Sequence, residues 1–181
     1  MSIAAVVLAA GESTRFGAPK QRILLPLVLE RLQQTNAVDE IVVVEGAYPL
    51  ALPSDNLSQG IPTRLVRCEE WSTGPGVSLR CGLSTLGSEV EAAVVVLADG
   101  PNLSPKAVER ILEAWRTAGG IVAASYEGHR SHPLALGREL WDDVPDEGLH
   151  GKSVQLVPCD DLGDPGDVDV PEDLPMGLRA S

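Results

Sequence analysis

Aromatic and basic side chains are both scarce in this chain. Only 3% of its 181 residues are aromatic, whereas 44% are hydrophobic, so the sequence predicts a single domain, residues 1–181, with an aliphatic core. Lysine and arginine number 14 against 26 acidic residues, which gives a formal net charge of −12. A surface of this charge repels a phosphodiester backbone, and we therefore expect no nucleic-acid partner.

Cysteine and long hydrophobic runs are scarce as well. Cys68, Cys81 and Cys159 are odd in number and contain no C-x-x-C pair, so the sequence predicts neither a disulfide framework nor a zinc knuckle and favours a reducing compartment. No hydrophobic run approaches the ~20 residues that a helix needs to span a bilayer. The apolar residues 1–10 lack a basic flank and a cleavage site. We expect a cytoplasmic protein that does not associate with membranes.

Alternating strand and helix patterns indicate the fold class. Three continuous hydrophobic runs are rich in β-branched residues, as is typical of parallel strands buried on both faces: residues 3–9, 41–44 and 92–98. Helical spacing precedes the second and third runs, in residues 27–34 and 77–86. Ser104-Pro105 predicts the start of a further helix and Gly119-Gly120 its end. This alternation predicts a layered α/β sheet.

The later part of the chain is expected to form further strands of the sheet and a short helix. Residues 121–126 and 134–136 are expected to form a strand that returns on itself through the turn at 127–130. A short helix is expected at 138–144, and late edge strands are expected at 155–159 and 168–170.

The candidate site follows from the sheet, because ligands of such sheets bind beyond the carboxyl ends of the strands. The segments after residues 9, 44, 98 and 170 are expected to meet there. The first 31 residues carry a local excess of two positive charges, and an anion is expected to bind them: Arg15, Lys20, Arg22 and Arg31 against Glu12 and Glu30. By contrast, residues 160–173 hold seven acids and no base, which is typical of a solvated loop or of a cation site.

A glycine-bearing loop follows the first predicted strand. Arg15 and Lys20 lie four and nine residues after Gly11, so amides of this loop could line a phosphate chain while the two cations neutralise it. Neither standard nucleotide fingerprint is present, because the loop lacks G-x-x-x-x-G-K-[ST] and Gly74-Pro75-Gly76 lacks the third glycine of G-x-G-x-x-G. Taken alone, such a loop is equally typical of a surface turn.

Residues 8–20 as a whole have the form L-A-A-G-x-S-x-R-x-G-x-x-K. This string resembles the signature of the MobA-like nucleotidyltransferases, most closely the branch that contains molybdenum cofactor cytidylyltransferase. Further segments resemble the family in the same order along nearly the whole chain: residues 70–83, 97–101, 131–134 and 168–174. The resemblance implies a three-layer, Rossmann-like (GT-A-like) α/β fold with a mostly parallel mixed sheet.

The resemblance also implies the nucleotide site. Arg15 and Lys20 would bind the triphosphate of an NTP, and together with Asp99 they are the expected catalytic residues. The full set expected to bind nucleotide is Leu8, Ala9, Ala10, Gly11, Arg15, Gly17, Lys20, Gly74, Gly76, Ser78, Leu79 and Asp99. Without the resemblance, Gly74-Pro75-Gly76 is simply a turn and Ser78 a helix-start residue.

The resemblance identifies Asp99 as the acid that holds Mg²⁺ and Asp169 as a second acid close to the same metal. Mg²⁺ prefers one or two carboxylates together with phosphate oxygens and water, which fits this assignment. An aspartate after a strand is also typical of a turn or an N-cap. Mg²⁺ is the expected cofactor, with Asp99 and Asp169 as its ligands.

Ala9-Ala10-Gly11 resembles the cytidine-using branch of the family, whereas guanosine-using relatives usually have Ala-Gly-Gly, so CTP is the expected donor. The alternative is that Ala10 only packs beneath the loop. His132-Pro133 resembles the His-Pro of the acceptor side in the family, although a buried structural histidine would fit the same residues.

The reaction implied is attack by a phosphate oxygen of an acceptor on the α-phosphorus of CTP, with release of pyrophosphate. The resemblance suggests molybdopterin as acceptor and a molybdoenzyme as partner. Residues 146–153 and Gly100 depart from the family on the acceptor side, so two other interpretations stay open. One is a sugar phosphate or another phosphorylated acceptor, and the other is a non-catalytic chaperone that holds a nucleotide or cofactor for a molybdoenzyme.

Overall fold

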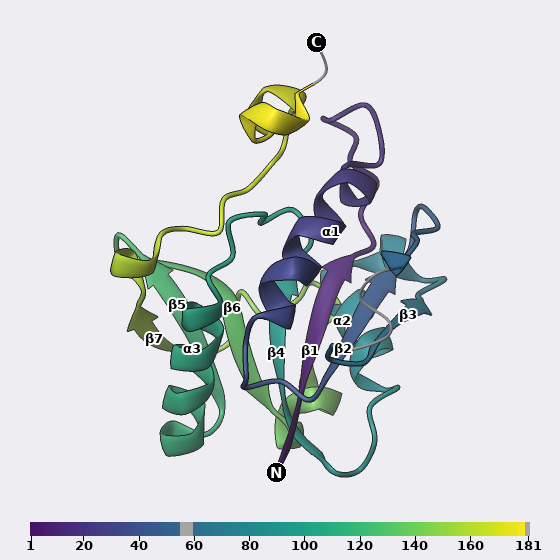
Figure 1. Cartoon of the computed structure of the whole chain (residues 1–181). Helices are drawn as coiled ribbons and strands as arrows, with labels where there is room; N and C mark the ends of the chain where they lie inside the picture. The colour runs from purple at the N-terminus through teal and green to yellow at the C-terminus, as the bar shows by residue number, and fades with distance from the viewer. Residues whose placement is uncertain (55–59, 180–181) are drawn as a thin grey trace.

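A seven-stranded mixed sheet forms the centre of the computed structural model, which describes residues 1–54 and 60–179 (Figure 1). The strand order is β3-β2-β1-β4-β6-β5-β7, and β1 pairs in parallel with both β2 and β4. Strand β6 runs antiparallel to β4 and β5. The strands are β1 Ser2–Ala9, β2 Glu40–Glu45, β3 Thr63–Arg67, β4 Val90–Leu97, β5 Ile121–Tyr126, β6 His129–Gly137 and β7 Gln155–Pro158.

Helices cover both faces of this sheet, which makes three layers. Helices α1 (Lys20–Gln33) and α3 (Pro105–Ala118) pack on one face, in front of the sheet in Figure 1. Helix α2 (Pro75–Leu83) and the 3₁₀ helix η3 (Arg138–Asp143) pack on the other. The predicted three-layer α/β fold with a mostly parallel mixed sheet is therefore confirmed.

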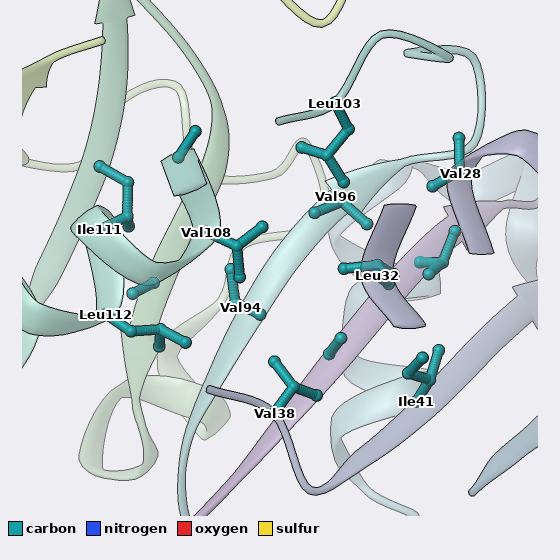
Figure 2. Close-up of a cluster of buried hydrophobic side chains, with 14 of the residues drawn as sticks. Val28, Leu32, Val38, Ile41, Val94, Val96, Leu103, Val108, Ile111 and Leu112 are labelled. Carbon is teal, nitrogen blue, oxygen red and sulfur yellow. The ribbon is translucent and has the colours of Figure 1, made fainter. Parts of the chain in front are cut away.

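The core is aliphatic, as the composition predicts. Alternate residues of β1 enter opposite layers: Val7 packs on the side of α1 and α3, whereas Val6 packs on the side of α2. Figure 2 shows the first of these layers, where Val108 of α3 lies beside Val94 of β4 and Leu32 of α1 belongs to the same cluster. Burial on both faces explains why the strands are continuous hydrophobic runs.

The parallel strands place several chain segments at one edge of the sheet, at the top of Figure 1. Strands β1 and β4 both end there, followed by residues 10–19 and 98–104. Because β6 is antiparallel to β4 and Leu134 pairs with Val95, the first residues of β6 lie beyond the same edge. This topology brings two loops and the start of β6 together where the ligand site is expected.

Two predictions about elements are wrong, and one strand was not predicted. Helix α1 begins at Lys20 rather than near Leu27 and contains Pro26, which is exposed, so water can reach the carbonyl group that the proline leaves without a donor. Strand β3 is missing from the sequence interpretation because this edge strand is only partly buried and has no continuous hydrophobic run. Residues 168–170 form no strand, since they cross the carboxyl edge of the sheet as a loop.

The expectation of unpaired cysteines is also wrong. Cys68 and Cys81 form a disulfide that joins the segment after β3 to α2, while Cys159 is free and buried. The two cysteines are 13 residues apart in the sequence and match no short motif, so only the packing of α2 against the end of β3 brings them together. Within the described residues, no helix is both long enough and apolar enough to cross a membrane.

Candidate active site

The loop between β1 and α1 is held in place by Gln21. This glutamine is buried, and its amide nitrogen donates to the carbonyl oxygen of Gly11 at 3.3 Å, while its amide oxygen accepts from the Ser13 hydroxyl at 2.6 Å. Ser13 has a positive φ of 55°, and its carbonyl oxygen accepts the amide of Phe16 at 3.0 Å. The loop backbone is therefore fixed before any ligand binds, and the N-terminus of α1 follows directly after it.

Lys20 is the first residue of α1, and its ammonium group is the centre of a charge network at the carboxyl edge. Its side chain is only 9% exposed. The nitrogen Nζ lies 3.0 Å from Oδ2 of Asp99 and 3.5 Å from Oδ1 of Asp169, and it donates to the carbonyl oxygen of Val168 at 2.5 Å. Because a buried charge is stable only when it is paired, this lysine holds two distant chain segments at the end of β1.

Arg15 extends this network to the surface. Its Nη1 lies 3.1 Å from Oδ2 of Asp169, and its side chain is 74% exposed. An exposed ion pair of this kind contributes little to stability. The guanidinium is therefore free to exchange its carboxylate for another anion.

The C-terminal segment carries Asp169 into the site by packing on α1. Val168 and Leu174 are buried against Phe16 and Leu24 in a small hydrophobic cluster. The amide of Val168 also donates to the carbonyl oxygen of Asp99 at 3.2 Å. Asp169 is thus positioned by hydrophobic contacts and by the backbone next to the other predicted metal ligand.

A third acid, Asp167, lies beside this pair. Burial raises its pKa, and the negative charges of Asp99 and Asp169 raise it further, because a third negative charge is unfavourable at this place. Oδ1 of Asp99 is buried and has no hydrogen-bond partner among the described residues. The site thus combines one available carboxylate oxygen with an excess of negative charge.

A cavity of about 770 Å³ opens at this charge network. Loop residues after β1, the start of α1, the end of β4 and the C-terminal segment line it on one side, and residues 71–78 line it on the other. Its volume lies in the range of small-molecule and cofactor sites. Both predicted metal ligands, Asp99 and Asp169, face this cavity.

The structure brings most of the predicted nucleotide residues together. Those that line the 770 Å³ cavity are Leu8, Ala10, Gly11, Arg15, Lys20, Gly74, Ser78 and Asp99. Leu79 lines a neighbouring cavity instead. Three others do not line either cavity: the Ala9 side chain packs in the core on the side of α1, Gly17 forms a turn with a φ of +76°, and Gly76 lies beneath residues 145–148.

Packing explains why glycines are needed at positions 74 and 76. A Cβ atom on Gly74 would lie 2.2 Å from the carbonyl oxygen of Asp146, and one on Gly76 would lie 1.6 Å from that of Pro145. The amide of Gly76 donates to Asp146 at 2.9 Å, and Arg80 of α2 forms an ion pair with the same aspartate at 2.5 Å. Both glycines therefore let residues 145–148 lie directly on the start of α2.

Ala10 both lines the cavity and packs beneath a neighbouring loop. A Cβ atom on Gly46 would lie 2.8 Å from the methyl group of Ala10 and 2.6 Å from the side chain of Trp71. Packing beneath the loop, one of the two alternatives for this alanine, is therefore confirmed, whereas its link to a cytidine donor stays a prediction.

His132 lines the neighbouring cavity of about 410 Å³, whereas Pro133 is buried and faces neither cavity. The peptide bond between these two residues is cis. Burial lowers the pKa of His132 to about 4, although the negative charge of Asp99 acts in the opposite direction. The imidazole is therefore uncharged at neutral pH and is both partly buried and in contact with the cavity.

Both cavities share four lining residues, Leu8, Pro75, Leu97 and His150, so they adjoin one another at the end of β1 and β4. Sequence reasoning missed Gln21, Trp71, Asp167 and Arg130, which all fix or line these spaces. Two of them carried a signal: Trp71 is one of three tryptophans in a chain poor in aromatic residues, and Asp167 belongs to the acidic segment 160–173.

Comparison with known proteins agrees with the motif resemblance. Residues 5–155 match the model of the MobA-like NTP transferase domain, and the chain belongs to this family. Rv0371c from Mycobacterium tuberculosis H37Rv has a similar structure, with 27% identity, a TM-score of 0.76 and 96% coverage of each chain. The 4-diphosphocytidyl-2C-methyl-D-erythritol synthase of Anaerococcus prevotii shares the fold at 16% identity, with a TM-score of 0.70 and coverage of 95% and 94%.

Two curated relatives have longer chains. The 2-C-methyl-D-erythritol 4-phosphate cytidylyltransferase of Stenotrophomonas maltophilia is 39% identical over 132 residues, which are 66% of this chain and 56% of that protein. The bifunctional protein GlmU of Sorangium cellulosum is 27% identical over 150 residues, which are 77% of this chain and 32% of that protein. The chain thus spans 32% of one of these relatives and 56% of the other.

Substitution of Gly76 by alanine is predicted to destabilise the fold. Helix propensity alone would make alanine about 1 kcal/mol more favourable than glycine within α2. The clash with the Pro145 carbonyl outweighs this gain, so we expect a net loss of about 1–3 kcal/mol in the free energy of unfolding, measured by urea denaturation. Gly151→Ala is the control, because a Cβ atom there meets nothing within 4 Å. Equal stability of the two variants would contradict this account.

The burial of His132 predicts its titration. In the unfolded chain its pKa is near 6.5, whereas in the folded protein it is about 4. As the pH falls, the unfolded state therefore binds the imidazole proton before the folded state does. The protonation of His132 should lower the free energy of unfolding progressively between about pH 6.5 and about pH 4, with no further loss below that. NMR titration of the imidazole resonances measures this directly. A midpoint near the usual 6.5 would show that the histidine is solvated.

Proposed function

We propose that this chain is a nucleotidyltransferase that moves a nucleoside monophosphate from CTP onto a phosphorylated small molecule and releases pyrophosphate. The observation that carries the proposal is the position of the Lys20 ammonium group. It lies between Asp99 and Asp169 in a 770 Å³ cavity, directly after a preorganised glycine-bearing loop. Membership of the MobA-like NTP transferase domain family supports the same reaction class.

Residues at the start of α1 would bind the triphosphate. Amides of the loop after β1 and the positive end of the 14-residue helix α1 favour an anion there, and Lys20 and Arg15 add two full charges. As pyrophosphate leaves, these cations would stabilise the charge that develops on it. Catalysis then depends on positioning and charge neutralisation, and no side chain needs to form a covalent intermediate.

Asp99 and Asp169 would hold the magnesium ion that the family implies. Oδ1 of Asp99 is buried without a partner among the described residues, so it is available as a ligand. No group of three or more His, Cys, Asp or Glu side chains that could hold a metal occurs in residues 1–54 and 60–179, and two carboxylates suit an ion that takes its other ligands from phosphates and water. Bound there, Mg²⁺ would withdraw negative charge from the phosphates and favour attack on the α-phosphorus.

The donor assignment to CTP rests on Ala10. Ala10 lines the cavity at a position where related guanosine-using sequences usually have glycine, and Trp71 lines the same cavity. The curated relative from Stenotrophomonas maltophilia is named as a cytidylyltransferase, which supports a cytidine donor.

The acceptor would occupy the 410 Å³ cavity beside His132, where it adjoins the donor across Leu8 and Leu97. The motif resemblance suggests molybdopterin, and with it a molybdoenzyme as partner for the product. A polyol phosphate is the second candidate, because the same relative carries 2-C-methyl-D-erythritol 4-phosphate in its name. In both cases the attacking atom is a phosphate oxygen.

Calorimetric titration with CTP and GTP in the presence of Mg²⁺ tests the donor site. We expect CTP to bind more tightly than GTP, and Lys20→Ala to weaken CTP binding strongly because it removes the central positive charge. Lys106→Ala, on the exposed side of α3, is the control and should bind CTP as the unmodified chain does. Equal affinities for CTP and GTP, together with an unchanged affinity for CTP in Lys20→Ala, would refute the donor site.

Turnover tests the reaction and separates it from a chaperone. With CTP, Mg²⁺ and a panel containing molybdopterin and polyol phosphates, Asp99→Asn should lower pyrophosphate release by about 10²–10³-fold, since it removes one charge from the metal ligands. Asp142→Asn, an exposed acid outside the cavity, should release pyrophosphate normally. If Asp99→Asn removes Mg²⁺ binding but leaves function in cells unchanged, the chaperone interpretation replaces the transferase.

A further inference from the structure

Resting on the proposed function, we propose that the 410 Å³ cavity selects an acceptor with a non-polar ring or hydrocarbon body, and that Arg130 is the specificity-determining residue that binds an anionic group of that acceptor. Arg130 lies at the start of β6 and lines this cavity together with His132, two residues further along the same strand. This arginine lies outside the segments that resemble the family.

The walls of the cavity are mainly aliphatic. Seven of its twelve lining residues are leucine, valine or proline, and they come from four different elements and a loop. Leu8 and Leu97 end β1 and β4, Leu79 lies on α2, Leu134 on β6, and Leu149 in the loop that follows η3. The apolar wall is therefore formed jointly by several elements of the fold and does not depend on a single exposed side chain.

Such walls disfavour a polyhydroxylated acceptor. Each hydroxyl that leaves water without a new hydrogen bond costs free energy, and the polar side chains of the cavity are limited to Arg130, Ser131, His132 and His150. A ring or chain without hydroxyls loses nothing in the same transfer and gains hydrophobic burial. The cavity therefore favours a non-polar body over a sugar or a polyol.

The charge of Arg130 has no carboxylate partner. In the part of the chain that the structure describes, its guanidinium forms one weak hydrogen bond, to the carbonyl oxygen of Lys152 at 3.4 Å, and no ion pair with an acid. This contrasts with Lys20, Arg80 and Arg110, which each pair with an aspartate of this acidic chain. A half-buried arginine that faces a cavity without a counter-ion is a site for an external anion.

Arg130 is the fixed positive charge of this cavity, because His132 beside it stays neutral. Burial lowers the pKa of His132 to about 4, and the positive charge of Arg130 contributes to the lowering. Burial also lowers the pKa of Arg130 itself, yet an arginine remains protonated in the neutral range. The anion is therefore held by the guanidinium, while His132 can offer a neutral hydrogen bond.

Binding of 1-naphthyl phosphate, followed by its ring fluorescence, tests this proposal against glucose 1-phosphate. Both without CTP and with CTP at saturation, we expect 1-naphthyl phosphate to bind at least about tenfold more tightly than glucose 1-phosphate. Arg130→Gln should weaken 1-naphthyl phosphate by at least about tenfold, and Arg130→Lys should recover part of that loss because it restores the charge without the planar fork. Arg116→Gln, on the exposed part of α3, is the control and should bind 1-naphthyl phosphate unchanged.

Three results of these measurements would overturn the proposal: no binding of 1-naphthyl phosphate, equally tight binding of glucose 1-phosphate, or an unchanged affinity of Arg130→Gln for 1-naphthyl phosphate. Displacement of 1-naphthyl phosphate by CTP would also overturn it, because the naphthyl compound would then occupy the donor cavity. Binding of CTP alone to the same samples distinguishes this failure from failure of the proposed function. If CTP binds and depends on Lys20 while naphthyl selectivity is absent, only the acceptor inference fails. If CTP does not bind while naphthyl selectivity is present, the transferase proposal fails instead.

Discussion

The ion pairing of one buried lysine organises the carboxyl edge of this protein. The Lys20 ammonium group contacts Asp99 and Asp169, which are 79 and 149 residues away along the chain. Its side chain is only 9% exposed, so water has little access to it. Removing the lysine charge would leave Asp99 without the cation that pairs with it, whereas Asp169 would keep its ion pair with Arg15. The same ammonium lies at the start of α1, so the interaction that closes the fold here also provides the positive charge that an anionic ligand needs.

Cations line both cavities of the proposed site although the chain as a whole carries −12. Arg15 and Lys20 face the larger cavity, and Arg130 faces the smaller one. In the larger cavity the two cations lie among Asp99, Asp167 and Asp169, so an anionic ligand there would meet both cations and carboxylates. Two adjoining cavities with cations at both suit a reaction between two phosphorylated molecules.

Much of the fold could be predicted from the sequence because the signals are local. The continuous runs that became β1, β2 and β4 are buried on both faces, and Ser104-Pro105 marks the start of α3. Elements with weak local signals were missed: β3 is a partly buried edge strand, and α1 begins at Lys20 although Pro26 lies within it. In the loop after β1, the motif identified Arg15 and Lys20, yet nothing in it showed that Gln21 fixes the backbone.

The sequence by itself determined the layered α/β architecture and the family, because hydrophobic periodicity and a motif of spaced residues can both be recognised within short stretches of the chain. Tertiary structure alone decided which distant groups meet: Cys68 with Cys81, Asp167 with the two predicted metal ligands, and Arg130 with the aliphatic cavity. It also decided why Gly74 and Gly76 must be glycines, since the backbone that excludes a side chain there belongs to residues 145–148. These contacts depend on the path of the chain between the elements, which local patterns do not encode.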